Sequence, residues 1–452
     1  MKWGWVFAVV VAGAAQAQEI PDNILSNQTE APPVRGADRS LSVKAFVDVA
    51  PQSNVWREPG VVPIPGSLDR SRWAGWSSLD ARLDARPADG VSLILSDRLD
   101  QTYADSHSPS THDLRNTLRE VYAGLSLTEE WFFDVGRINN KDGVATGFNP
   151  TDFFKKQAVL IRQNSDPAAL RDVRLGVFMA RVQRVWDGGA VTALVAPALV
   201  DGNGALRDQV FNLGLDRTNR DNRFLLKGSL RVVEDWVPEV LLHLDGKHSP
   251  IFGANVTHGF GDRLVTWGEW SAGRRGDVVS EALAEGVRTS LFPSTTSAPI
   301  GHDGFQAIRH QGVLGGSLSF ENKLTLTAEW HYNQQGLTPS EWHSWFGQSS
   351  AKAALLWQMR SFAQDAGEPM SRNQVFSRAD WTDFLIKDLE VSGFTVLNPA
   401  DGSVFVQMEG AYYLDPRTTL GLRASTSLGA HTSEWGSVPQ AYGVTARLVR
   451  YF

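Results

Sequence analysis

Residues 77–86 read Ser-Ser-Leu-Asp-Ala-Arg-Leu-Asp-Ala-Arg, and this stretch decides the fold class. From Leu79 onward every second residue is apolar and each residue between is charged. Side chains alternate between the two faces of a β-strand, so the stretch predicts a strand with one apolar and one ionic face. The same alternation recurs in 41–49, 120–127, 226–233 and 324–332.

Strand number and length separate a membrane barrel from a soluble sandwich, which shows the same alternation. We count eighteen candidate strands, many of them about ten residues long, the length that a tilted strand needs to cross a bilayer. Their predicted centres are Ala45, Leu79, Leu95, Ala123, Phe133, Val177, Val195, Leu226, Leu241, Ala254, Trp267, Leu314, Leu326, Phe376, Gly393, Val406, Leu422 and Thr445.

The predicted connections alternate between short and long. Short ones carry turn residues, as in Pro87–Gly90 and Glu321–Lys323, whereas Asn139–Leu170 and Gln334–Arg372 are long. Two positions on the long side, near 247–249 and 399–402, are short. Short turns on one side and long loops on the other are typical of an outer-membrane barrel with periplasmic turns. An even number of strands places both chain ends on the turn side.

The first seventeen residues have the pattern of an export signal. Lys2 precedes an apolar run over Val6–Ala15, and Ala15-Gln16-Ala17 is a small-x-small cleavage site. The run is too short to span a bilayer. We therefore predict a signal peptide over 1–17, a polar disordered lead-in over 18–40, and a transmembrane barrel over 41–452.

Composition excludes several other classes of protein. The 452 residues include 43 Lys and Arg, 50 Asp and Glu, and no Cys, giving a net charge of −7. Without Cys there is no disulfide, Cys-ligated zinc or Cys nucleophile. The acidic balance argues against nucleic acid. Beyond the N-terminus no apolar run of about eighteen residues occurs, which excludes a helical membrane protein.

An apolar outer face and an ionic inner face fix what the barrel interior contains. A Lys or Arg facing lipid at mid-bilayer costs about 2–4 kcal/mol, so the charged rows point inward. Eighteen strands enclose a space too wide for side chains alone to fill. Rows of opposite charge create a transverse field in a water-filled pore; alternatively, they are paired and only keep the lumen wet. The wall residues we favour as pore-lining are Arg82, Arg86, Arg98, Arg231, Glu329, Arg378 and Arg423.

A loop rich in turn residues follows the predicted strand around Phe133. It runs from Gly136-Arg137 through Asn149-Pro150-Thr151-Asp152 to Lys155 and Lys156. We predict that it folds into the channel and narrows it, with Arg137, Asp152, Lys155 and Lys156 setting the local charge. The alternative is an ordered external turn that holds the rim.

A second long loop carries a helix signal. Thr338-Pro339-Ser340-Glu341 is a capping box with proline at the first helical position. Ala351, Ala354, Leu355, Met359 and Phe362 then share one helical face. This face must be buried against the inner wall or a neighbouring loop. The segment is either a gate or cap, or a helix on the rim without a gating role.

Two segments resemble known families of outer-membrane proteins. The last strand, with Tyr442, Val444, Ala446, Leu448 and a terminal Phe452, resembles the C-terminal signal of bacterial outer-membrane proteins, although Arg450 stands where an apolar residue is usual. That resemblance implies recognition of Phe452 by the barrel-assembly machinery. The segment with Gly136, Arg137, Asn149, Pro150 and Asp152 resembles large proteobacterial barrels of the porin-like and alginate-export type. This resemblance implies an eighteen-stranded transport channel with loop plugs, but acids interrupt the arginine-lined conduit of the alginate exporter.

The sequence thus predicts an outer-membrane channel that passes small polar or charged solutes by diffusion, surrounded by lipid and lipopolysaccharide. The alternatives are a gated exit channel for a secreted polysaccharide or peptide, and an assembly or adhesion barrel without transport. No His-x-x-x-His or His-Glu-x-x-His motif occurs, so we expect no metal, no cofactor and no enzymatic activity.

Overall fold

The computed structural model describes residues 39–57, 70–105, 112–156, 158, 164–200, 213–231, 236–246, 249–288, 292–298, 300, 304–305, 307–348 and 359–452. Within them lie eighteen strands: β1(Ser40–Trp56), β2(Trp73–Ala88), β3(Val91–Ala104), β4(His112–Ser126), β5(Trp131–Ile138), β6(Val177–Trp186), β7(Gly189–Ala196), β8(Arg223–Leu230), β9(Trp236–Asp245), β10(Ile251–Phe260), β11(Leu264–Arg274), β12(Ile308–Ser319), β13(Leu324–Asn333), β14(Asn373–Trp381), β15(Leu389–Leu397), β16(Val404–Asp415), β17(Thr418–Leu428) and β18(Gln440–Tyr451). The predicted signal peptide, 1–17, and all of the predicted lead-in except its last two residues lie outside the described residues.

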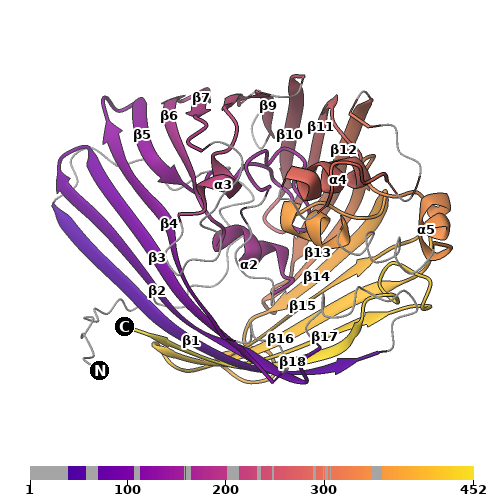
Figure 1. Ribbon diagram of the computed structural model, residues 1–452. Helices are drawn as coiled ribbons and strands as arrows, with labels where there is room; N and C mark the ends of the chain where they lie inside the picture. The colour runs from indigo at the N-terminus through magenta and orange to yellow at the C-terminus, as the bar shows by residue number, and fades with distance from the viewer. Residues whose placement is uncertain are drawn as a thin grey trace.

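The strands form one closed antiparallel ring (Figure 1). Each strand pairs with its sequence neighbours, and β1 closes the ring by pairing with β18, with Val47 opposite Arg450. Every predicted strand centre falls within a strand of its own. The predicted fold class, an up-and-down barrel of eighteen antiparallel strands, is confirmed.

The two ends of the barrel differ in their connections. At one end most described turns are tight, as at Asp89-Gly90, where Gly90 has the positive φ of +68° that a short hairpin requires. The connections at the other end hold the helices α2(Pro167–Asp172), α3(Leu215–Thr218), α4(Val278–Arg288) and α5(Pro339–Phe346). No helix in the described ranges is long and apolar enough to cross a membrane.

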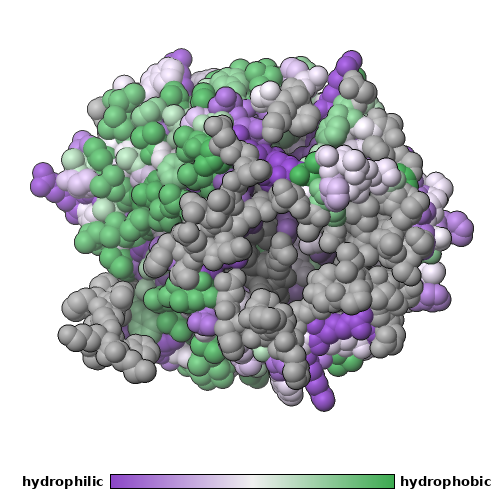
Figure 2. Space-filling model, viewed as in Figure 1, coloured by the Kyte–Doolittle hydropathy of each residue, from purple (hydrophilic) through white to green (hydrophobic). Residues whose placement is uncertain are grey.

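The outer face of the ring is apolar and the inner face is polar. On β17, Leu422 is 58% exposed, whereas its inward neighbour Arg423 is 6% exposed. On β2, Leu79 is exposed and Asp80 is buried in the same way. Figure 2 shows hydrophobic residues gathered over the side of the molecule on which Figure 1 draws the first strands. The alternation seen in the sequence is therefore the alternation of outside and inside.

Loops from the helix-bearing end pack against the inner wall and each other. One buried cluster joins Val144, Ala145 and Phe148, from the connection after β5, to inward residues of β11 and β12. Another joins α4, α5 and residues 359–370. The interior is thus filled in part by chain, and the connection between β5 and β6 occupies its middle (Figure 1).

Candidate functional site

The described residues of the connection 139–176, namely 139–156, 158 and 164–176, lie across the interior of the ring. The connection leaves β5 and returns to β6, yet its residues contact the inner faces of strands far around the barrel. The amides of Thr146 and Gly147 donate to Glu329 on β13. Asp166, the N-cap of α2, pairs with Arg378 on β14 at 2.8 Å. These contacts are geometrically possible only because the segment spans the lumen.

Apolar side chains attach this crossing segment to the wall. Phe154 packs among inward residues of β6 to β9, including Met179 and Leu241. Phe148 packs against Val265 and Trp267 on β11. Burying a side chain of this size contributes about 1.5–3 kcal/mol, so the two phenylalanines hold the segment at separate points of the wall.

Ion pairs fix the turn predicted to narrow the channel. The Asp152 carboxylate is buried and receives two hydrogen bonds from Arg174, at 2.6 and 3.3 Å. Lys155 donates to the Asn149 carbonyl at 2.9 Å, and its ammonium lies 3.3 Å from Glu368. Burial lowers the pKa of the Lys155 ammonium, and Glu368 is the nearest carboxylate that opposes this shift. Lys156 is 41% exposed and lies 4.0 Å from Glu281 on α4.

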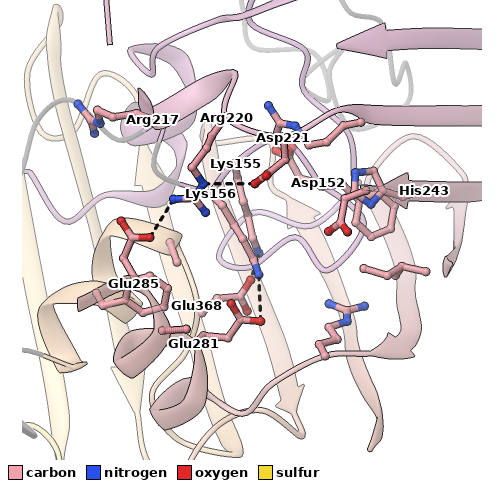
Figure 3. A pocket seen from close by; sticks show the side chains of 18 of the residues that line it. Asp152, Lys155, Lys156, Arg217, Arg220, Asp221, His243, Glu281, Glu285 and Glu368 are labelled. Atoms are coloured by element: carbon pink, nitrogen blue, oxygen red, sulfur yellow. Dashed lines mark hydrogen bonds and ion pairs between the residues drawn. The ribbon is translucent and has the colours of Figure 1, made fainter. Parts of the chain in front are cut away.

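Beside this turn is a cavity of about 410 Å³ (Figure 3). The turn 150–156 forms one side, and the ends of β8 to β11, α4 and residues 362–368 form the others. Figure 3 shows Lys155 and Lys156 on the side of Glu368 and Glu281, whereas Glu285 pairs with Arg220. Arg288 and Arg220 lower the pKa of Glu285 although burial opposes them. A volume of this order accommodates a small molecule.

Charged side chains dominate the lining of this cavity, with eight cations and six carboxylates. The cations are Lys155, Lys156, Arg217, Arg220, Arg223, Arg274, Arg275 and Arg288, and the carboxylates are Asp152, Asp221, Asp245, Glu281, Glu285 and Glu368. The difference gives the lining two surplus positive charges. Nowhere among the described residues do three or more His, Cys, Asp or Glu side chains form a group that could hold a metal ion.

The predicted wall residues lie on the inner face, and most are paired. Arg82 contacts Glu120 at 3.0 Å, and Arg98 contacts Asp100 at 2.8 Å. Arg423 pairs with Glu409 at 2.7 Å. Arg378 instead pairs with Asp380 and with the crossing segment. None of these four arginines is among the residues that line the cavity.

Three further residues of the predicted set have different surroundings. Arg86 is exposed near the turn end of β2. Arg231 follows the last residue of β8 and is exposed at the same end. Arg137 on β5 is fully buried, donates to the Gly176 carbonyl at 2.9 Å and lies over the Phe178 ring. Whether any of the predicted residues lines a conducting pore stays a prediction.

The second predicted loop contains the expected helix. Thr338 and Glu341 form the capping box of α5, and Trp342 and Trp345 are buried. Of the predicted second helical face, Met359 and Phe362 pack against the cluster of α4 and α5, whereas 351–358 lie outside the described residues. The sequence left two surfaces open for this helical face, the inner wall or a neighbouring loop. Its described residues, Met359 and Phe362, contact the neighbouring loop. Its gating role stays a prediction.

The wall residues under the crossing segment are largely absent from the set predicted from the sequence. Glu269 on β11 accepts hydrogen bonds from the segment and was not among the predicted site residues. One signal was present: the inward positions Val265 and Trp267 on β11 are apolar, whereas strands such as β2 and β17 carry polar residues at inward positions. Apolar residues on both faces of a strand indicate that something covers the inner face.

One solved structure, at a TM-score of 0.50, shares the barrel architecture. No family model and no curated protein matches the chain. Among solved structures it is similar to OccK5 (OpdH) of Pseudomonas aeruginosa, with TM-score 0.50 and 9% identity over 91% of this chain and 97% of that one. It is also similar to OccK3 (OpdO) of the same organism (TM-score 0.49, 10% identity, 91% and 95% covered) and to Salmonella typhi OmpF in complex with daunomycin (0.41, 7%, 92% and 98%). At 9% identity the first of these shows the fold alone, a closed barrel of the porin type.

Proposed function

We propose that the chain is an outer-membrane channel through which small polar or charged solutes diffuse. The observation that carries this proposal is the segment 139–176, which crosses a closed ring and borders a charged cavity inside it. Eighteen strands enclose an interior too wide for side chains alone to fill, so we expect a water path beside the crossing segment. The exposed apolar outer face supports a lipid environment, because a soluble protein rarely leaves so continuous an apolar surface in water.

The proposed orientation follows from the two ends of the ring. The tight turns face the periplasm, and β1 begins and β18 ends on that side. In this arrangement the cavity and α4 lie toward the outside. The signal peptide over 1–17, recognition of Phe452 by the assembly machinery, contact with lipopolysaccharide and the relation to alginate-export barrels stay predictions.

Planar-bilayer recording tests the proposed function. The purified full chain, inserted in a lipid bilayer, is expected to give steady ohmic conductance steps. Absence of current in the full chain, with current appearing after deletion of 334–372, would instead favour a gated exporter. Absence of current from both forms would remove the transport proposal.

Charge reversal at Lys156 is expected to shift ion selectivity toward cations. Lys156→Glu abolishes the surplus of two positive charges in the cavity lining. Two unit charges a few ångströms from a hydrated ion are worth on the order of 1 kcal/mol before screening, so the anion-to-cation permeability ratio should fall about two- to fivefold. The reversal potential in a KCl gradient measures this ratio.

Lys323→Glu provides the matched control for this prediction. Lys323 lies in an exposed turn at the opposite end of the barrel and pairs with Asp383. The same reversal there should leave the reversal potential near its wild-type value. Equal shifts in both variants, or none in Lys156→Glu, would count against the cavity as part of the ion path.

A further inference from the structure

We propose that Glu269 and Glu329 form a carboxylate latch that holds the crossing segment in the lumen, and that acidification releases it and widens the channel. The latch is defined as these two wall carboxylates and the backbone of residues 144–151 that they bind. The inference rests on the proposed channel function and adds a mode of regulation to it.

Glu269 on β11 is the centre of one half of the latch. It is 3% exposed, and its oxygens accept from the amides of Val144 at 2.9 Å, Ala145 at 3.2 Å and Thr151 at 2.7 Å. The Thr151 hydroxyl donates to it at 2.8 Å. One wall carboxylate thus binds three backbone amides of a segment more than a hundred residues away in sequence.

Glu329 on β13 forms the other half. The amides of Thr146 and Gly147 donate to its two oxygens at 2.6 and 2.9 Å. The Trp267 indole donates at 3.1 Å, and His331 lies at 2.7 Å. Gly147 lies so close to the wall that a Cβ there would come within 2.9 Å of His331 and Phe376, so the contact is direct.

The partners of these two carboxylates differ from those of the other wall acids. Asp48, Asp100, Glu120 and Glu409 are each paired with an arginine. Among the described residues, no Lys or Arg nitrogen lies within 4.0 Å of Glu269 or Glu329. Their charge is balanced by the amides of the crossing segment, so the segment and the ionised carboxylates stabilise each other.

The other ionisable groups around the latch are themselves engaged. From the crossing segment, the Lys155 charge acts on Glu269 from beyond contact distance while its ammonium pairs with Glu368. Asp152 is held by Arg174. From the wall, His331 is stacked on Phe376 at 5.9 Å and faces Glu329. Protonation of the two glutamates is therefore the change that acts directly on the amide contacts.

The sign of the pH effect follows from hydrogen-bond chemistry. Hydrogen bonds to an ionised acceptor are about twice as strong as neutral ones. Once protonated, the carboxyl carries an O–H donor and has lost the charge that the amides stabilise. As the pH falls, the five amide contacts weaken together, and the segment leaves the wall.

Single-channel recording of the full chain at neutral pH and at about pH 4, near the ordinary Glu pKa, tests the latch. Wild-type conductance should rise about twofold or more in acid, because release widens an eighteen-stranded lumen. Glu269→Gln/Glu329→Gln should show the raised conductance already at neutral pH and no further rise in acid. Asp48→Asn is the matched control. Asp48 on β1 pairs with Arg447 on the adjacent β18, away from the latch strands β11 and β13, and this variant should keep the wild-type acid response.

A reversible cross-link gives a measurement that does not depend on the glutamine variants folding. The chain has no cysteine, and a Cβ at Gly253 on β10 would lie 2.9 Å from Thr151 Cγ2. A disulfide in Thr151→Cys/Gly253→Cys should abolish the acid response, and reduction should restore it.

The outcomes separate this inference from the proposed function. A wild-type conductance that is unchanged or lower in acid would overturn the latch and leave the channel standing. So would a glutamine variant with the wild-type pH response, or a cross-linked variant that still opens. No current from any form at either pH would overturn the channel, and the latch with it.

Discussion

Leu422→Arg is expected to destabilise the folded barrel in a bilayer by about 2–4 kcal/mol, because Leu422 lies in the middle of β17 on the apolar outer face. Arg423, the next residue, already carries a guanidinium, but on the inner face beside Glu409. The substitution therefore places a guanidinium in hydrocarbon, whereas that of Arg423 is in the polar interior. The rest of the strand is unaltered. Denaturant titration of the chain refolded into lipid vesicles measures the free energy of unfolding.

Ser425→Arg is the matched control. Ser425 is two residues beyond Arg423 on β17, so its side chain is also on the inner face. We expect this variant to lose less than about 1 kcal/mol, as at polar positions without a buried partner. Equal losses in the two variants would show that the outer face does not contact hydrocarbon. The membrane location would then fail together with the channel.

The barrel could be predicted from the sequence because its strands obey a local rule. Lipid on one side and water on the other impose a period of two, and residues 79–86 follow it without interruption. Turn residues such as Asp89-Gly90 mark the strand ends. The closing pair of β1 and β18 is not local, but the even number of strands and the exclusion of free sheet edges from lipid require it.

The candidate site could be predicted only in part. The segment with Asp152, Lys155 and Lys156 was identified by its turn chemistry, and these residues do meet at one cavity. The distant carboxylates that hold this segment could not be found in this way. Glu269, which accepts from Thr151, and Glu368, which pairs with Lys155, are both more than a hundred residues away in sequence. Register and loop path decide such contacts, and neither leaves a periodic signal in one sequence.

Inward charge also proved an incomplete guide to function. Arg82, Arg98 and Arg423 are on the inner face as the alternation predicts, yet each is bound to a neighbouring carboxylate. A paired guanidinium contributes less to the field in the lumen than a free one. The alternation therefore gives the direction of a side chain, whereas its available charge depends on the residues of the adjacent strands.

Excision of residues 142–171 is expected to raise single-channel conductance at least about threefold, because the segment that crosses an eighteen-stranded lumen is then absent. The cut ends lie close together, since the Lys141 ammonium is 2.7 Å from the Asp172 carboxylate, so a short Gly-Ser linker can join them. Exclusion of polyethylene glycols of increasing size from the channel provides a second readout of its width.

The excision should also lower the free energy of unfolding. A higher conductance together with a lower free energy of unfolding would show that the segment packs against the inner wall. Val265, Trp267 and Val313 are each at most 3% exposed beneath it, and excision opens them to lumen water. Each such side chain contributes about 1.5–3 kcal/mol when fully buried, so the denaturant midpoint should fall measurably. A segment lying outside the lumen would change neither quantity. Lower stability at unchanged conductance would mean that another segment limits the pore, and the helices of 334–372 would be the next to excise.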